Sequence, residues 1–363
     1  MTSNGVGMGH LTRLLAVATR LPGQAGGAAV QPVFASLSKG VHVVERFGIP
    51  HTYIPSGPAL AMEPQDWELY LRRRLARLLD DVAPDVVVFD GVHPYDGLIE
   101  NLRVRGTGTG DEGALRAVWM RRAMWRPESS ARALGRARHF DLVIEPGDHA
   151  SSYDSGVTTS RQDAHRVAPI TLLSADQLLS REQARVELGY GEQEKVALIT
   201  LGAGNIRDLG PVQSRVLEWF SRHAPDWRPV LTKAPISEAG PAQYSTLQAY
   251  PLARYTRAFD AAMSSCGYNA FHEWTAGALP TLWVPITETP TDDQAARAQW
   301  AADHGMSLTL GSVTGAEAAA ALEDGLRRLT DGDARTRMEQ KLLGLPGQSG
   351  AQEAAQLIVG LAS

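Results

Sequence analysis

The first residues that could do chemistry lie near the start of the chain, where a glycine-rich turn precedes a histidine. Gly7 and Gly9 flank a methionine, His10 follows, and residues 11–21 have helical spacing. Glycine lets a backbone turn tightly against a ligand, and an imidazole, whose pKa is ordinarily near neutrality, can remove a proton there. The spacing fits neither a dinucleotide fingerprint nor a phosphate loop with Gly-Lys-Ser/Thr. A catalytic base and a structural turn remain as alternatives.

A second candidate group follows the apolar run 85–89, which is typical of a strand buried on both faces. Asp90 comes directly after this run, and ligands of open α/β sheets bind at the carboxyl ends of strands. Its carboxylate could orient a histidine from a neighbouring strand end, as in a His–Asp dyad. The alternative is that Asp90 caps a helix that follows Pro94.

In the second half of the chain, small residues follow a predicted strand. Gly202, Gly204 and Asn205 come after the run 196–201. Backbone N–H groups of such a segment could cradle a diphosphate. An ordinary glycine turn explains the same residues equally well.

The most specific pattern spans residues 264–294. A strand leads into a glycine turn, a helix that carries Glu273, a Gly-x-x-Pro turn, a strand that ends in Val-Pro, and a polar loop. The helix start would present N–H groups to a phosphate, Glu273 could accept hydrogen bonds from a ribose diol, and the loop could read sugar hydroxyls. The residues predicted to bind this ligand are Ser265, Gly267, Tyr268, Asn269, Glu273, Asp293 and Gln294.

Apolar runs and helical stretches alternate along the chain, which predicts βαβ units and parallel sheets. A chain of 363 residues exceeds one typical core and suits two domains. A polar stretch without periodicity lies near the middle. We therefore predict an α/β protein of two Rossmann-like, doubly wound domains facing a cleft. Their predicted ranges are 1–150 and 171–345, with a linker over 151–170 and a C-terminal helix within 346–363.

Individual elements follow from the same patterns. The predicted strands are 30–35, 51–54, 85–89, 115–120, 141–144, 196–201, 229–232, 261–264 and 281–284. The predicted helices are 39–47, 67–79, 212–222, 270–278, 294–304, 316–329 and 351–361. Only four residues precede Gly5, so either residues 1–4 form a short first strand or that strand is absent.

Composition excludes several classes of protein. The one cysteine, Cys266, cannot form an intrachain disulfide or a Cys-rich zinc site. A net charge of −5 argues against a nucleic-acid partner. No window reaches the roughly 18 apolar residues that span a bilayer, and the N-terminus lacks a signal pattern. We therefore expect a cytoplasmic protein with at most peripheral membrane contact.

Two further patterns have ordinary explanations. Asp331-Gly332-Asp333 mimics a manganese motif, but it falls in a polar turn between two predicted helices, so we expect no metal there. Residues 121–138 hold six arginines, for which a solvated helix face is the first interpretation. The alternatives are a wall of an acceptor pocket or a contact with anionic lipid.

The pattern of residues 264–294 resembles the donor-site signature of GT-B glycosyltransferases. It is most similar to UDP-glycosyltransferases and the bacterial peptidoglycan N-acetylglucosaminyltransferase. Glu273 stands six residues after Gly267, and Asp293-Gln294 stand where that family reads the sugar. Residues 7–10 and 202–205 match its two glycine loops. One departure is Arg297, where the peptidoglycan enzyme has an asparagine.

The resemblance implies an inverting, metal-independent transfer of a sugar from UDP or dTDP to a hydroxyl of a small-molecule or lipid acceptor. No cofactor is implied. His10, oriented by Asp90, would remove the acceptor proton, with Gly7, Gly9 and His93 in the acceptor loops. Residues 202–205 and the helix after Gly267 would stabilise the diphosphate. Residues 249–255 would line the base pocket, and the C-terminal helix would cross back onto the first domain.

Two rival functions share this fold. A GT-B-fold epimerase of UDP-amino sugars would need several acidic and histidine residues around the sugar. A catalytically silent partner subunit would be expected to have lost some of His10, Asp90, Glu273 and Gln294.

Overall fold

The computed structural model describes most of the chain, as two compact units. The described residues are 1–3, 8–24, 30–107, 114–126, 131–201, 210–232, 245–288, 291–311, 315–347 and 349–362. The first unit comprises Met1–Gly147, Ser155–Leu172 and Ser349–Ser363. The second unit comprises Asp148–Asp154 and Leu173–Gln348. The backbone therefore passes between the units four times, after residues 147, 154, 172 and 348.

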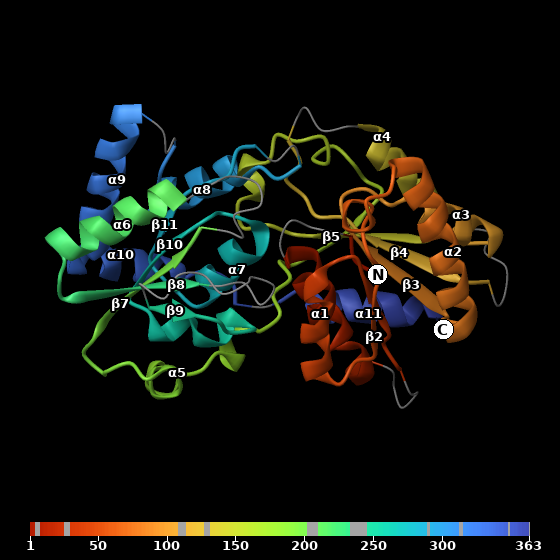
Figure 1. Cartoon of the computed structure of the whole chain (residues 1–363), viewed down its shortest axis with the longest axis horizontal. Helices are drawn as coiled ribbons and strands as arrows, with labels where there is room; N and C mark the ends of the chain where they lie inside the picture. The colour runs from red at the N-terminus through yellow and green to blue at the C-terminus, as the bar shows by residue number, and fades with distance from the viewer. Residues whose placement is uncertain are drawn as a thin grey trace. The chain divides into compact units, whose positions relative to one another are not determined.

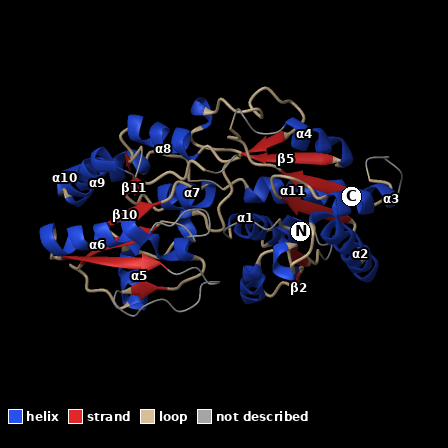
Figure 2. Ribbon diagram, turned by 45° about the horizontal axis from the view of Figure 1, so that its top comes forward, coloured by secondary structure: helices blue, strands red, loops and turns tan. Residues whose placement is uncertain are grey.

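Parallel strands form the centre of the first unit (Figures 1 and 2). One pair is β1–β2, and a second group has the order β3-β4-β5-β6. The strands are β1 (Phe34–Ser36), β2 (His51–Tyr53), β3 (Val86–Asp90), β4 (Arg116–Met120), β5 (Leu142–Pro146) and β6 (His165–Val167).

The N-terminal residues Met1–Ser3 join these two groups of strands. Thr2 forms parallel bridges to Ser36 on one side and to Asp90 on the other. The Asp90 amide donates a hydrogen bond to the Met1 carbonyl at 2.9 Å. Of the two alternatives left by the sequence, the structure therefore shows the short first strand.

The helices of the first unit lie on both faces of this sheet. Helix α1 (Gly9–Ala18) leads from the N-terminal segment to the neighbouring strand β1, whereas α2 (Pro64–Val82) and α3 (Asp96–Val104) lead in the opposite direction along the sheet, to β3 and β4. Because such crossovers are right-handed, opposite directions place helices on opposite faces. In agreement, α2 packs on α3, whereas α11 (Ala351–Ala362) packs on α1 (Figure 1).

The sequence of α2 shows how one helix serves the core. Pro64 occupies the first turn, where its missing N–H costs nothing, and a stripe spaced by four residues is buried: Trp67, Leu71, Leu75 and Leu79. A β-carbon on Gly97 of α3 would lie 2.8 Å from the backbone nitrogen of Arg72. Glycine therefore permits the close approach of α2 and α3.

The second unit has one parallel sheet of six strands, in the order β12-β11-β10-β7-β8-β9. Its strands are β7 (Lys195–Thr200), β8 (Trp227–Thr232), β9 (Thr246–Leu247), β10 (Ala261–Ser264), β11 (Thr281–Trp283) and β12 (Leu308–Thr309). Its helices are α5 (Arg181–Leu188), α6 (Gly210–His223), α7 (Tyr268–Ala276), α8 (Gln294–Asp303), α9 (Gly315–Thr330) and α10 (Gly332–Leu342).

Short helices complete both units. Helix α4 (Ala131–Leu134) and the 3-10 helices η1 (Leu21–Gln24), η2 (Lys39–Phe47), η3 (Pro58–Leu60) and η4 (Gly135–His139) belong to the first. The 3-10 helices η5 (Ser151–Tyr153), η6 (Ala175–Gln177) and η7 (Leu252–Ala258) belong to the second.

The predicted α/β class with parallel sheets is confirmed, and two stretches have a different structure from the one predicted. The stretch 151–170, expected to be a linker, contains β6, which pairs with β5. Only Val167 of β6 is buried, so the strand leaves almost no apolar signal in the sequence. The predicted helix over 39–47 is the 3-10 helix η2.

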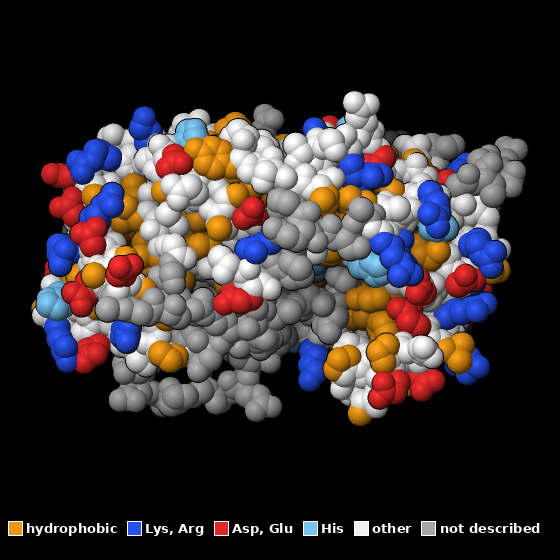
Figure 3. Space-filling model, turned by 90° about the horizontal axis from the view of Figure 1, so that it is seen from above, with side chains coloured by type: hydrophobic (Ala, Val, Ile, Leu, Met, Phe, Trp, Pro, Cys, Tyr) orange, Lys and Arg blue, Asp and Glu red, His pale blue; other side chains and the backbone are white. Residues whose placement is uncertain are grey.

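The surface carries mixed charge. On the face that Figure 3 shows, Lys and Arg side chains are interspersed with Asp and Glu side chains. Within the described ranges, no helix combines the length and the apolar character needed to span a bilayer.

Candidate active site

His10 and Asp90, predicted as a pair, meet in the first unit. His10 lies in the first turn of α1, and Asp90 ends β3. The imidazole Nδ1 is 2.7 Å from Oδ1 of Asp90. The carboxylate is fully buried, whereas the His10 side chain is 17% exposed. Asp90 does not cap the next helix, since α3 has Tyr95 at its N-cap position.

A third residue, Arg13, completes this cluster and was not predicted. Its side chain is 3% exposed, and Nε donates to Oδ2 of Asp90 at 2.8 Å. The Nη2 atom of Arg13 contacts Oδ1 of the same carboxylate and lies 3.1 Å from Nδ1 of His10. The signal in the sequence is the i,i+3 spacing of His10 and Arg13, which places both on one face of α1.

Burial and the charges in this cluster together set the protonation of His10. Burial favours the neutral form of Asp90, but Arg13 and His10 outweigh it and hold the carboxyl pKa below its ordinary value. Burial lowers the pKa of His10, against the opposing effect of Asp90. A neutral imidazole facing an ionised carboxylate donates its Nδ1 proton to it, so Nε2 keeps the lone pair. This arrangement can take a proton from a hydroxyl.

The other predicted residues of the first unit are Gly7, Gly9 and His93, which the sequence analysis assigned to the acceptor loops. Gly9 opens α1, and Gly7 lies outside the described residues. His93 is exposed in the loop after β3. Partial burial and the cation of Arg136 lower the pKa of His93.

The predicted glycine turn of the second unit is present at Gly267. This residue is the N-cap of α7 and has no side chain to satisfy the first N–H groups of the helix. Ser265 precedes the turn, Tyr268 and Asn269 begin the helix, and a β-carbon on Gly267 would lie 3.9 Å from Nε2 of Gln294. The helix start is therefore suited to an anion. The matching loop at 202–205 lies outside the described residues.

Glu273 stands in the second turn of α7 and is partly buried. Burial raises its pKa from 4.5 to about 8. Within the described part of the chain, no donor contacts its carboxyl group. A carboxyl with unused acceptor capacity fits the predicted contact with a diol.

The predicted sugar-reading pair has partners within the protein. Oδ1 of Asp293 caps α8 by accepting from the Ala296 amide at 3.0 Å. Gln294 is buried, and its Oε1 accepts from the Ile286 amide at 3.0 Å. These hydrogen bonds fix the loop beside Gly267. Hydrogen bonding of either side chain to the sugar hydroxyls of a donor stays a prediction.

Arg297 is the buried centre of the second unit's polar network. Nε donates to Oδ2 of Asp148 at 2.8 Å, and Nη1 donates to the Cys266 carbonyl at 2.8 Å and to Oδ1 of Asp292 at 3.1 Å. Cys266 directly precedes Gly267. The guanidinium therefore fixes the backbone of the glycine turn from behind, and two carboxylates neutralise it.

His272 has a structural role. Its Nδ1 lies 2.8 Å from the Tyr268 carbonyl and its Nε2 accepts from the His149 amide at 3.3 Å. Burial lowers its pKa to about 3, so the ring is neutral. The two contacts assign the proton to Nδ1.

Part of the arginine interpretation is wrong. Arg121 and Arg122 follow β4 and are buried, so they do not belong to a solvated helix face. Arg121 pairs with Glu145 at 3.3 Å and with Asp163 at 3.0 Å. Buried ion pairs of this kind depend on tertiary partners, which the local pattern does not reveal.

The remaining candidates have local roles. Asp331 caps α10 by accepting from the Ala334 amide at 2.7 Å. Within the described ranges, no group of three or more His, Cys, Asp or Glu side chains could hold a metal. Of residues 249–255, part forms η7, and the Tyr255 hydroxyl donates to Glu187 at 3.1 Å.

Comparison with known proteins identifies the fold. No family model matches the chain, and no curated protein matches its sequence. Solved structures do match, at low identity. The glycosyltransferase of kitacinnamycin is 16% identical with a TM-score of 0.66, covering 100% of this chain and 98% of that one. MurG of Acinetobacter baumannii is 16% identical with a TM-score of 0.61, covering 99% and 98%.

A third match is the spinosyn rhamnosyltransferase SpnG in complex with thymidine diphosphate. It is 15% identical with a TM-score of 0.57, and the match covers 98% of each chain. At these identities the likeness establishes the fold. The chain has the GT-B fold of two Rossmann-like domains, the architecture predicted from its sequence.

Proposed function

We propose that this protein is a glycosyltransferase that moves a sugar from a nucleoside diphosphate to a hydroxyl group. The observation that carries the proposal is the His10–Asp90 pair, with its buried carboxylate, at a strand end of a GT-B fold. The pair offers a neutral imidazole whose Nε2 carries the lone pair, which is the group that activation of a hydroxyl requires.

The proposed reaction is a single displacement with inversion. Nε2 of His10 accepts the proton of the acceptor hydroxyl while the oxygen forms a bond to the anomeric carbon. The bond from that carbon to the diphosphate oxygen breaks, and the diphosphate leaves with the electron pair. Asp90 holds the imidazole in the required tautomer and stabilises the imidazolium that forms.

The second unit would hold the donor. The free N–H groups at the start of α7 would bind the diphosphate and stabilise its leaving charge in place of a metal ion. Glu273 would accept from the ribose hydroxyls. We propose UDP or dTDP as the nucleotide, since SpnG, which shares the fold, was solved with thymidine diphosphate.

The finer parts of the proposal rest on the sequence resemblance. They are inversion, metal independence, a small-molecule or lipid acceptor, and a cytoplasmic location. The epimerase alternative would need acidic and histidine groups around the sugar. The carboxyl of Glu273, which no donor among the described residues contacts, together with the intact His10–Asp90 pair argues against a silent subunit.

The test is turnover of a panel of UDP- and dTDP-sugars, with and without chelator, by wild type, His10→Ala and Glu273→Ala. Exposed His42 supplies the matched control His42→Ala. We expect His10→Ala to lose turnover while it retains donor binding, and Glu273→Ala to weaken donor binding. An active donor that is insensitive to both changes would refute the site. Conversion of a UDP-sugar to its epimer would support the epimerase.

A further inference from the structure

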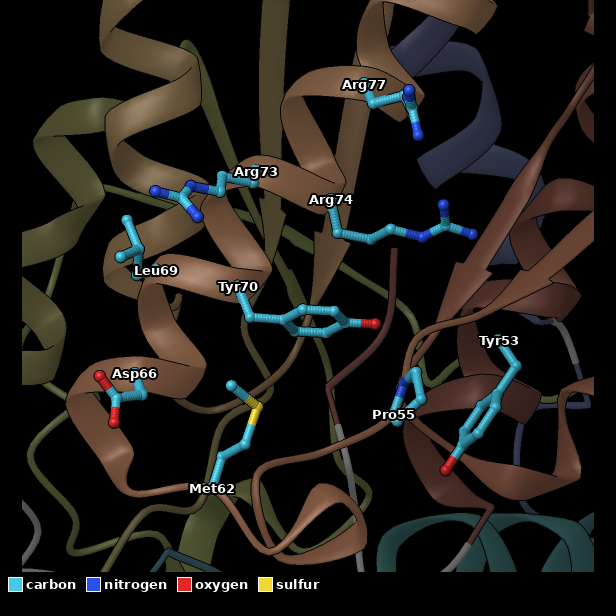
Figure 4. Close-up of a pocket in the computed structure, with 9 residues that line it drawn as sticks. All are labelled: Tyr53, Pro55, Met62, Asp66, Leu69, Tyr70, Arg73, Arg74 and Arg77. Atoms are coloured by element: carbon cyan, nitrogen blue, oxygen red, sulfur yellow. The ribbon is translucent and has the colours of Figure 1, made fainter.

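The first unit contains a cavity that is lined by none of the residues assigned to the proposed reaction. Its volume is about 780 Å³, within the range of small-molecule sites. It is lined by the end of β2, by the segment that follows, and by one face of α2 (Figure 4). Tyr53, Pro55 and Met62 contribute from before α2, and Tyr70 contributes from the helix.

The charge of this cavity is strongly one-sided. Arg73, Arg74 and Arg77 of α2 line it, against one acidic residue, Asp66. No ion pair is formed by these three arginines with the described residues, whereas Arg105 and Arg136 of the same unit have carboxylate partners. Adjacent like charges on one helix repel each other. An anion bound among them would relieve that repulsion.

Three of the α2 side chains that line the cavity point in a common direction. Figure 4 shows Tyr70, Arg74 and Arg77 extending to the same side of α2, toward Tyr53 and Pro55, whereas Arg73 extends to the other side. Guanidinium groups bind phosphate or carboxylate oxygens through paired N–H groups, and the tyrosine hydroxyls add further donors. The tyrosine rings, Pro55 and Met62 supply apolar contact area.

We propose that this cavity binds a small organic anion, a phosphate or carboxylate attached to an aromatic or other apolar group. Arg74 and Arg77 bind the anionic group, and Tyr53 and Tyr70 contact the apolar part. The site is distinct from the His10–Asp90 pair. Its lining includes neither His10 nor Asp90, nor any residue of α1. The proposal therefore stands independently of glycosyl transfer.

The test uses phenyl phosphate as the probe and calorimetric titration of the full chain. We expect saturable binding that Arg74→Gln and Arg77→Gln each weaken about tenfold, since each removes a charge-assisted pair. Arg72→Gln, on the same helix but outside the cavity, is the matched control. Binding of phenyl phosphate at the glycine turn of the second unit would persist in every variant. The variants therefore distinguish that binding from binding in the cavity.

Four outcomes would overturn the proposal. The first is the absence of phenyl phosphate binding, and the second is equal affinity in Arg74→Gln and Arg72→Gln. Equal affinity for inorganic phosphate and phenyl phosphate would refute the apolar part. Binding to vesicles of anionic phospholipid without binding to phenyl phosphate would show a lipid surface instead of a small-molecule site.

Discussion

In the first unit, two neighbouring residues, Asp90 and Arg13, affect the protonation of His10. Asp90 accepts from both Arg13 and His10, so its negative charge is divided between a permanent cation and a titratable ring. If Asp90 faced His10 alone, it would raise the pKa of the imidazole strongly. Burial is the main cause that lowers the pKa of His10 against Asp90, and the cation of Arg13 lowers it further. We infer that Arg13 extends the pH range in which His10 can act as a base.

This balance predicts a pH profile. The folded-state pKa of His10 is below 6.5, so the base form persists at neutral pH and activity falls only as pH drops through that lower value. Arg13→Gln removes a cation that lowers the pKa, and the acid limb of kcat/KM should move to higher pH. The control is Arg103→Gln, an exposed residue. An unmoved acid limb in Arg13→Gln would contradict this role.

Glu273 predicts a conflict between stability and binding. Its pKa of about 8 in the folded state exceeds its ordinary 4.5, so folding favours the protonated form. The stability that this preference gives is complete below pH 4.5 and is lost as pH rises toward 8. Glu273→Gln should therefore unfold less readily than wild type at pH 8, on the order of 1–3 kcal/mol, yet bind donor more weakly.

The measurement is urea unfolding of wild type and Glu273→Gln at pH 5 and pH 8, alongside donor affinity. The stability difference should grow between the two pH values. Exposed Glu182→Gln should show no such growth. Equal donor affinity in wild type and Glu273→Gln would exclude a ribose contact.

At the scale of elements, burial determines what the sequence predicts. Strands β7 and β10 were predicted within one residue, because both faces are buried and the apolar run is continuous. Strand β6 was missed because only one of its three residues is buried, so it has no apolar run. Strands β9 and β12, with two residues each, are too short to show a period.

The site divides in the same way. The meeting of His10 and Asp90 follows from strand ends, since the carboxyl ends of parallel strands share one edge. The partners of Arg297 do not, because Asp148 is 149 residues away and no local period relates them. Sequence analysis identified Arg297 only as a departure from the family pattern, whereas the structure shows a buried support for the glycine turn.

This support predicts the effect of Arg297→Met. The change leaves Asp148 and Asp292 buried without their cation, which should cost roughly 3–5 kcal/mol of stability. Arg297→Lys keeps the charge and should cost less, while it still loses the fixed geometry at Cys266. Denaturant unfolding gives the stability, and the donor KM gives the effect on the turn.

A double variant separates the two effects. Arg297→Met with Asp148→Asn removes a buried charge and should recover part of the stability, but not the donor KM. If Arg297→Lys binds donor as wild type does, Arg297 stabilises the unit without positioning the turn.

At the scale of the whole molecule, the two units are interleaved along the sequence. Helix α11, at the C-terminal end, belongs to the first unit, where Ala351, Ala354, Ala355 and Ile358 are buried. It packs on α1, which carries His10 (Figure 1). Residues at opposite ends of the sequence therefore support one unit.

Ile358→Ala should accordingly destabilise the first unit by about 2–5 kcal/mol through the cavity it leaves. Hydrogen exchange read by peptide should accelerate across β3, β4 and α1, and remain unchanged in the second unit. Leu343→Ala is the control, since Leu343 is 69% exposed and lies in the second unit. Faster exchange confined to the second unit would contradict the assignment of α11.

A nucleotide should stabilise the other unit. A ligand that binds only the native state adds about 2.7 kcal/mol at a hundred times its Kd. If the second unit alone carries the donor site, saturating UDP or dTDP should raise the midpoint of a calorimetric transition. Exchange should slow at residues 265–273 and leave α1 unchanged. The same nucleotide should have a smaller effect on Glu273→Gln, because its ribose contact is missing, and a full effect on His10→Ala. Slower hydrogen exchange centred on α1 instead would place the nucleotide in the first unit and exclude a donor site in the second unit.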